Sequence, residues 1–245
     1  FDVMMPLYLA TYIAMIGVHI IVYILMSFIR FPVVQPAASH VEGPQRPLWE
    51  IAIQPRFAAA VIAGMASFGM MMFVMSASPL AMVGCGLPPT EVPMVIFLHV
   101  MGMFVPSFFT GNLINRFGVE NVMAAGAVIL LVSVLAALDG LTAWHFRIAL
   151  ALNGLGWNFL FIGATLVVTG CYWPSERGKA QALNDFLIFA TAASCSFLAG
   201  FLQELIGWIN LSGASAGLVA IAFCGVLWLR LQPQPAPALG FDRST

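Results

Sequence analysis

Seven stretches of the chain are almost wholly apolar, and each is about as long as a helix that crosses a lipid bilayer. Such a helix needs about 20 mainly apolar residues. Membrane-spanning strands are not expected, because the runs are too long and their apolar residues do not alternate with polar ones. The predicted spans are residues 4–29, 57–83, 92–114, 121–138, 146–171, 180–205 and 211–231. The pattern therefore predicts an all-α, polytopic membrane helical bundle.

Polar segments rich in proline divide the chain into four parts. A continuous helix is not expected between the first two spans, because that segment carries five prolines. We interpret it as a flexible or partly ordered linker, and the proline-rich end of the chain as a disordered tail. The predicted parts are a first transmembrane helix (residues 1–29), a central linker (30–56), a six-helix bundle (57–231) and a tail (232–245).

Composition supports the membrane interpretation and excludes several function classes. Hydrophobic residues make up 61% of the chain and charged residues 8%, whereas a soluble domain carries about 25% charged residues. The net charge of −1, without a basic run, gives no reason to expect a nucleic-acid partner. The four cysteines are scattered, and no metal or cofactor motif is visible. Small residues predict close helix contacts at Gly102, Gly126, Gly163, Gly200, Gly213 and Gly217.

Basic residues are distributed unequally between the two sides of the predicted bundle, and cytoplasmic loops carry the excess of Lys and Arg. Eight lie on the side of the linker and tail, which we therefore predict to be cytoplasmic: Arg30, Arg46, Arg56, Arg116, Arg177, Lys179, Arg230 and Arg243. Only Arg147 lies on the other side. The chain begins at Phe1 without an initiator Met, and we expect it to be a fragment that lacks an N-terminal part.

The loop after the third predicted span carries the motif that is most informative about family. The segment Gly111–Gly118 reads GNLINRFG, with Asn115 and Arg116 near its centre. It resembles the cytoplasmic G-x-x-x-[DN]-R-x-G signature of the major facilitator superfamily, in the position expected for its second copy. The family continues with basic residues, whereas this chain has Val119 and Glu120. The resemblance implies a gating role for this loop; the alternative is an ordinary cytoplasmic arginine in a tight turn.

A second loop, Pro174–Asp185, resembles the segment P-x-x-x-R-G-x-A-x-[AG] that many family members carry between helices ten and eleven. By this resemblance Glu176 and Arg177 look like partners in a cytoplasmic charge network. Asp185 lies about one turn inside the next helix, where an unpaired carboxylate is costly. We expect the helix N-terminus, Lys179 or Arg177 to compensate it, with a structural or gating role rather than solute binding.

The resemblance covers residues 4–231 and implies the layout of a transporter from its sixth helix onward. Family members move small organic solutes by alternating access between two six-helix bundles, so the missing N-terminal half is an implied partner. A bacterial inner membrane is the implied location. Further stretches look like one bacterial subgroup, with which riboflavin import is associated, but they assign no substrate. They are residues 71–82, 99–110 and 154–158.

By the resemblance, the second, third, fifth and sixth spans line the solute cavity. Histidine has an unperturbed pKa of about 6.5, so His99 is a candidate for a coupling proton or a solute contact. The alternative is a neutral ring bonded to a neighbouring helix. Indole and amide groups orient planar polar ligands, and apolar side chains form a wall; interhelical bonding and packing are the alternatives. The candidates are His99, Met103, Asn153, Trp157, Asn158, Phe68 and Met71.

Two other classes of membrane protein have seven spans or polar residues inside them. A seven-helix receptor would not explain the long linker or the Gly111–Gly118 loop, and a retinal pump would need a lysine in its last span, whereas the only lysine is Lys179 in a loop. A membrane-embedded enzyme would need clustered His, Asp or Glu residues, and the histidines are widely spaced. We therefore predict a transporter and not an enzyme.

Overall fold

The long apolar runs form helices because a helix satisfies its backbone N–H and C=O groups internally, where hydrocarbon offers them no partner. The computed structural model describes residues 4–29 and 45–233, and the regular elements in these ranges are helices, without a strand. The predicted all-α fold is therefore confirmed. The chain divides into two units, Phe1–Val41 and Glu42–Thr245, which are described separately.

The first unit contains a single described helix, α1 (Met4–Phe28), with no charged residue. Two of its polar side chains bond to the helix itself: Ser27 donates to the carbonyl of Ile24 at 2.7 Å, and the ring of His19 lies 2.7 Å from the carbonyl of Met15. Such local bonds satisfy polar groups without a second helix. The helix is therefore suited by length and composition to cross a membrane on its own.

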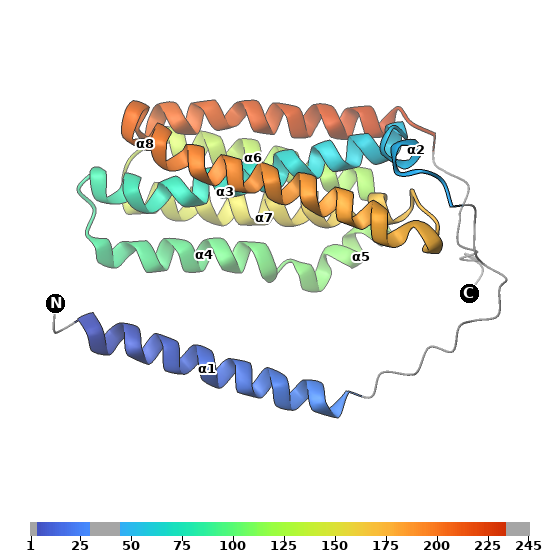
Figure 1. Cartoon of the computed structure of the whole chain (residues 1–245). Helices are drawn as coiled ribbons and strands as arrows, with labels where there is room; N and C mark the ends of the chain where they lie inside the picture. The colour runs from blue at the N-terminus through green and yellow to red at the C-terminus, as the bar shows by residue number, and fades with distance from the viewer. Residues whose placement is uncertain (1–3, 30–44, 234–245) are drawn as a thin grey trace. The chain divides into compact units, whose positions relative to one another are not determined.

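The second unit is a bundle of long helices joined by short turns (Figure 1). Its helices are α2 (Leu48–Ala52), α3 (Pro55–Gly84), α4 (Val92–Phe104), α5 (Ser107–Phe117), α6 (Val119–Asp139), α7 (Ala143–Thr169) and α8 (Arg177–Arg230), with short 3-10 turns at Pro89–Glu91 and Pro174–Glu176. Among the described helices, α1, α3, α6, α7 and α8 are each long and apolar enough to cross a membrane, and the bent pair α4–α5 adds a sixth. The seven predicted spans fall on these helices, except for one or two residues at the ends of three spans and the break between α4 and α5.

The last helix, α8, contains two of the predicted spans. Gly207 interrupts it with φ 73° and ψ 172°, a conformation that glycine adopts without steric cost. The chain reverses direction there, so residues 177–206 and 208–230 form two segments of α8 (Figure 1). The predicted turn is confirmed in position but is shorter than expected, since the helix resumes at Trp208, whose Nε1 donates to the carbonyl of Ala137 at 3.1 Å.

The third predicted span, expected as one helix over residues 92–114, is broken. Helices α4 and α5 meet at an angle of 41° around Val105 and Pro106. Proline has no N–H, so Pro106 cannot bond to the carbonyl of Gly102, and its ring disfavours the preceding helical turn. The expectation of one regular helix is therefore corrected to two helices with a bend between them.

The C-terminal end of the predicted linker is ordered and not flexible. Residues 30–44 lie outside the described residues, as do residues 234–245 of the predicted tail. Residues 45–54, however, contain α2, whose Ile51 is fully buried in the apolar core. Helix α3 then begins at Pro55, two residues before the predicted start of the bundle, because proline is favoured in the first turn of a helix. The end of the linker thus packs as part of the bundle.

Glycines let α7 approach its two neighbours backbone to backbone. A methyl group at Gly102 of α4 would meet the carbonyl oxygen of Ala151 and lie 3.2 Å from the nitrogen of Leu155. A methyl group at Gly126 of α6 would lie 2.9 Å from the carbonyl oxygen of Gly156. Gly163 contacts the side chain of Met123 on α6, whereas the predicted contacts of three other glycines are not seen within 4 Å: Gly200, Gly213 and Gly217.

We predict that Gly102→Ala destabilises the full-length protein by about 1–3 kcal/mol, because the added methyl group forces α4 away from α7. Thermal unfolding in detergent measures the change. Gly213→Ala is the matched control, since nothing lies within 4 Å of a methyl group at that helical position. Equal unfolding temperatures for the two variants would show that the α4–α7 approach tolerates a side chain.

Candidate binding site in the helix bundle

Four aromatic side chains from three helices contact one another in the second unit. The ring of Phe68 on α3 meets that of Trp157 on α7 nearly edge to face, with centroids 5.4 Å apart. Trp157 stacks on Phe161 of the same helix at 4.9 Å and 12°. Phe68 also lies 5.5 Å from the ring of Phe189 on α8. These four residues are called the aromatic cluster below, and their edge and stacked contacts are the favoured arrangements of aromatic rings.

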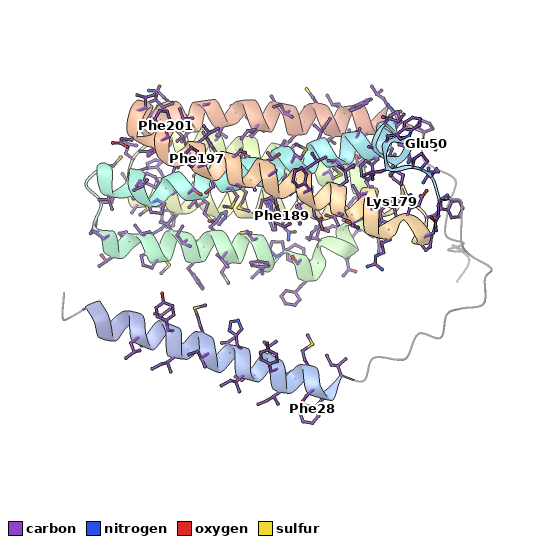
Figure 2. All side chains as sticks on the ribbon, viewed as in Figure 1. Phe28, Glu50, Lys179, Phe189, Phe197 and Phe201 are labelled. Atoms are coloured by element: carbon purple, nitrogen blue, oxygen red, sulfur yellow. The ribbon has the colours of Figure 1, made fainter. Side chains whose placement is uncertain are left out.

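The aromatic cluster extends from the interior of the bundle to its surface. Trp157 is buried, whereas the side chain of Phe189 is 57% exposed in this chain. Figure 2 labels Phe189 on the first segment of α8, and Phe197 and Phe201 follow it along the same segment. Exposed faces of aromatic rings next to a buried indole can stack against a flat ring system. The cluster therefore offers a surface for a planar ligand.

Polar atoms without partners accompany the aromatic cluster on α3 and α7. Among the described residues, Trp157 Nε1, Asn153 Oδ1 and Ser67 Oγ are buried and have no hydrogen-bond partner. Asn153 precedes Trp157 by one helical turn, and its Nδ2 reaches the carbonyl of Met71 on α3 only at 3.5 Å. A buried polar atom left unpaired costs about 1–3 kcal/mol. A ligand with its own donors and acceptors would remove this cost.

Three other predicted candidates lie instead at the contact between α7 and the pair α4–α5. His99 is fully buried, and its Nδ1 lies 2.9 Å from the carbonyl of Leu150. Asn158 donates from Nδ2 to the carbonyl of Met103 at 2.7 Å. These bonds correspond to the alternative kept for His99 and Asn158 above, namely bonding between helices. Phe68, Met71, Asn153 and Trp157 therefore lie together in the structure. His99, Met103 and Asn158 lie at the contact of α7 with α4 and α5.

Two members of the aromatic cluster were not predicted from the sequence. Phe161 follows Trp157 by four residues, so their position on one face of a helix could have been read from the spacing. Phe189 lies on α8, and its contact with Phe68 depends on how α3 packs against α8. No local sequence pattern predicts such a contact, because aromatic residues are common throughout this chain.

Glu176 is the most strongly bonded charged group in the loop between α7 and α8. Its carboxylate is fully buried and accepts from the Nε of Arg46 at 2.9 Å, from the Nη2 of Arg46 at 2.6 Å and from the backbone N–H of Arg46 at 2.8 Å. The N–H of Trp173 donates a further bond at 3.0 Å. The predicted partner Arg177 is exposed. The expectation that Arg177 is the partner is therefore corrected. The partner, Arg46, lies in the predicted linker, too far away in sequence for a local pattern to indicate it.

These bonds shift the acid–base behaviour of the pair in opposite directions. Hydrogen bonds from Arg46 lower the pKa of Glu176 to about 2, against the opposing effect of burial. The same hydrogen bond raises the pKa of Arg46 from its ordinary value. Both groups therefore remain charged in the neutral range, and the pair holds the end of the linker against the loop.

The Gly111–Gly118 motif is helical up to Phe117, so Gly118 alone connects α5 to α6, and the connection is shorter than the sequence predicted. Gly118 has φ 86°, which explains why glycine ends the motif. Arg116 is exposed, as is Asn115, and its guanidinium lies 5.3 Å from the ring centre of Phe117. Glu120, in the first turn of α6, pairs with Arg56 of α3 at 3.1 Å. The departure from the family pattern at Glu120 thus has a partner of opposite charge.

Asp185 has a different environment from the one predicted. It is exposed in this chain and accepts a hydrogen bond from Nδ2 of Asn184 at 3.0 Å. Lys179 donates to the carbonyl of Arg46 instead. The sequence suggested that Lys179 or Arg177 compensates Asp185, but neither contact is among those described. Exposure lowers the cost of leaving this carboxylate without a cation.

Comparison with known proteins now decides the family. Residues 59–244 match the Major Facilitator Superfamily. The chain belongs to this superfamily. The predicted family, a family of transporters and not of enzymes, is thereby confirmed, and the chain is part of a multi-pass membrane protein.

Individual relatives are bacterial transporters. The chain is 45% identical over 213 residues to the riboflavin transporter RfnT of Brucella anthropi, which covers 87% of this chain and 53% of that protein. It is 33% identical to the uncharacterized MFS-type transporter YddS of Bacillus subtilis, over 63% of this chain and 36% of that protein. The chain thus spans about half the length, or less, of the curated relatives it matches.

We predict that Glu176→Gln lowers the stability of the full-length protein at neutral pH by about 1–3 kcal/mol, because Arg46 loses its charged acceptor. The depressed pKa stabilises the fold above the ordinary pKa of a glutamate, about 4.3, and this stabilisation is lost as the pH falls toward about 2. The difference between wild type and variant should therefore shrink over that range in thermal unfolding. Glu204→Gln, at an exposed position of α8, is the control; a pH-independent difference would contradict the assignment.

Proposed function

We propose that the full-length protein is a secondary transporter for a small, planar heteroaromatic solute of the flavin type, which it moves by alternating access. The observation that carries this proposal is the aromatic cluster with the partnerless Nε1 of Trp157 and Oδ1 of Asn153 beside it. Stacking would hold the flat ring, and the two polar atoms would select a solute with both a hydrogen-bond acceptor and a donor.

The cluster lies on the helices that the family uses for its solute cavity. By the family resemblance, α3, α7 and the first segment of α8 correspond to helices seven, ten and eleven, and they supply all four rings. The relative from Brucella anthropi is a riboflavin transporter, and its similarity extends over 87% of this chain. A flavin has a flat ring system and polar edges, which fits the residues of the cluster.

The proposed setting is a bacterial inner membrane, with the linker and C-terminus in the cytoplasm. Basic residues at one end of the described bundle support this orientation, since cytoplasmic ends carry more Lys and Arg: Arg46, Arg56, Arg116, Arg177, Lys179 and Arg230. We further propose that an N-terminal six-helix bundle, whose last helix is α1, completes the cavity. Transport is therefore expected of the full-length protein.

Trp157→Leu in the full-length protein should weaken riboflavin binding about tenfold, because the buried indole supplies both a stacking face and a donor. Quenching of flavin fluorescence in detergent gives the dissociation constant, and uptake into proteoliposomes gives the rate. Trp144→Leu is the matched control, since Trp144 is 62% exposed at the start of α7, two turns or more from the cluster.

The riboflavin-binding comparison has three outcomes that can be told apart. Weaker binding by the Trp157 variant alone supports a flavin at the cluster. Riboflavin binding that is equal in wild type, Trp157→Leu and Trp144→Leu would place the flavin elsewhere, and no binding by wild type would exclude flavins as the solute.

A coupling proton is the second part of the proposal, with His99 as its site. A carbonyl oxygen only accepts, so the bond to Leu150 requires a proton on Nδ1 of His99. In the neutral ring, Nε2 then carries the free lone pair, and this buried atom has no partner among the described residues. Protonation would occur at Nε2, in a helix that the family uses for its cavity.

We predict that His99→Gln in the full-length protein flattens the dependence of riboflavin uptake on pH between about pH 5 and pH 8, where histidine titrates. Initial uptake rates in proteoliposomes with and without a proton gradient measure this. His145→Gln is the control, because His145 lies in an end turn beside Asp139 at 3.3 Å. An unchanged uptake–pH curve for His99→Gln would remove His99 from the proposed coupling.

A further inference from the structure

The break between α4 and α5 is bridged by one side chain of α7. Asn158 bonds to both sides of the break: to the carbonyl of Met103 on α4, and to the hydroxyl groups of Ser107 and Thr110 on α5. We infer that Asn158 is a positioning residue that latches α5 to α7, and that release of α5 from this latch, with bending at Val105 and Pro106, is a step of the transport cycle. The inference rests on the proposed transport function.

The geometry of the latch fixes the role of each atom. The carbonyl of Met103 can only accept, so the atom of Asn158 that lies 2.7 Å from it is the Nδ2 donor. The same Nδ2 donates to Ser107 Oγ at 2.7 Å. The Oδ1 atom accepts from Thr110 Oγ1, also at 2.7 Å. Thr110 Oγ1 also donates to the carbonyl of Pro106 at 2.8 Å, so its single proton is shared between Pro106 and Asn158.

Few side chains of α5 are buried in the described bundle. Within Ser107–Phe117 only Thr110 and Ile114 are buried, one turn apart on the same face. Phe108, next to the bend, is 89% exposed in this chain. By contrast, α4 packs backbone to backbone on α7 at Gly102. The bonds of Asn158 therefore supply a large share of the interactions between α5 and α7.

Both ends of α5 can change direction. At its start, Pro106 removes one helical hydrogen bond, and the bend of 41° is already present. At its end, Gly118 has φ 86° and joins α5 to α6. The helix also carries most of the Gly111–Gly118 loop, so a movement of α5 moves this loop relative to α7.

Hydrogen bonds to hydroxyl groups are suited to such a step. Removing an amide from its partners inside a membrane is costly, but one pair of bonds can be exchanged for another at little net cost. The bond to Met103 keeps Asn158 anchored on α4, which stays packed on α7. The bonds to Ser107 and Thr110 are the ones that would break when α5 moves.

The test compares three variants of the full-length protein in detergent by hydrogen exchange and mass spectrometry. Asn158→Leu removes every bond of the latch, Thr110→Val removes one while keeping the shape, and Thr110→Ser keeps the hydroxyl group. Thr169→Val is the control, because the hydroxyl of Thr169 bonds only within α7, to Leu166 at 2.7 Å. The first two variants should speed exchange in residues 107–117 about tenfold and leave peptides of α4 and α7 unchanged.

Transport gives the readout that a merely structural role would not change. The riboflavin dissociation constant should stay within twofold of wild type in Asn158→Leu and Thr110→Val, while the maximal uptake rate changes at least threefold. Thr110→Ser should restore both exchange and rate. If Asn158→Leu does not fold, the Thr110 pair decides the question alone.

Three results would overturn the inference. Unchanged exchange in α5 would show that no latch is present. Faster exchange throughout α4 and α7 would make Asn158 a general packing residue. Weaker riboflavin binding with unchanged exchange would make Asn158 a solute ligand. If wild type binds no riboflavin, the proposed substrate fails, whereas the exchange comparison still supports or overturns the latch.

Discussion

Hydrocarbon provides no hydrogen-bond partner, and this constraint explains the main features of the bundle. Continuous helices satisfy their own backbone, so the long apolar runs need nothing more. Where a helix is interrupted, another group must supply the missing partner. At the bend between α4 and α5, Asn158 bonds to the carbonyl of Met103, and Gly207 divides α8 at a position where the chain reverses. Polar side chains inside the spans therefore bond at a break, as Asn158 does, or between helices, as His99 and Ser133 do.

Residues of α7 make three kinds of contact within about one and a half turns. Gly154 and Gly156 bring α4 and α6 close, Asn153 and Trp157 face α3 and the aromatic cluster, and Asn158 holds the bend of the neighbouring span. Close packing fixes the rotation of α7, and this rotation sets the direction of its polar side chains. Solute contact and movement of α5 would thus be coupled through a single rigid element.

The end of the bundle at which α3 and α8 begin is organised by polar pairs between segments distant in sequence. Arg46 of the linker meets Glu176, and Arg56 at the start of α3 meets Glu120 at the start of α6. Arg230 at the end of α8 donates to Asn121 at 2.6 Å. Glu176 lies in the loop before α8, whereas Glu120 and Asn121 lie in the first turn of α6, directly after the Gly111–Gly118 motif. Such pairs stabilise one arrangement of these segments.

The sequence by itself determined the membrane class, the positions of the spans and the family, because apolar length and the Gly111–Gly118 motif are local properties. It also pointed to Trp157 and Asn153 as candidate solute contacts, which stays a prediction. Only the tertiary structure decided which partners these groups have. Glu176 pairs with Arg46 across 130 positions, and Phe189 joins the cluster through the packing of α3 on α8. A hydrogen bond between helices depends on their rotation and bend, and neither is encoded in any one segment.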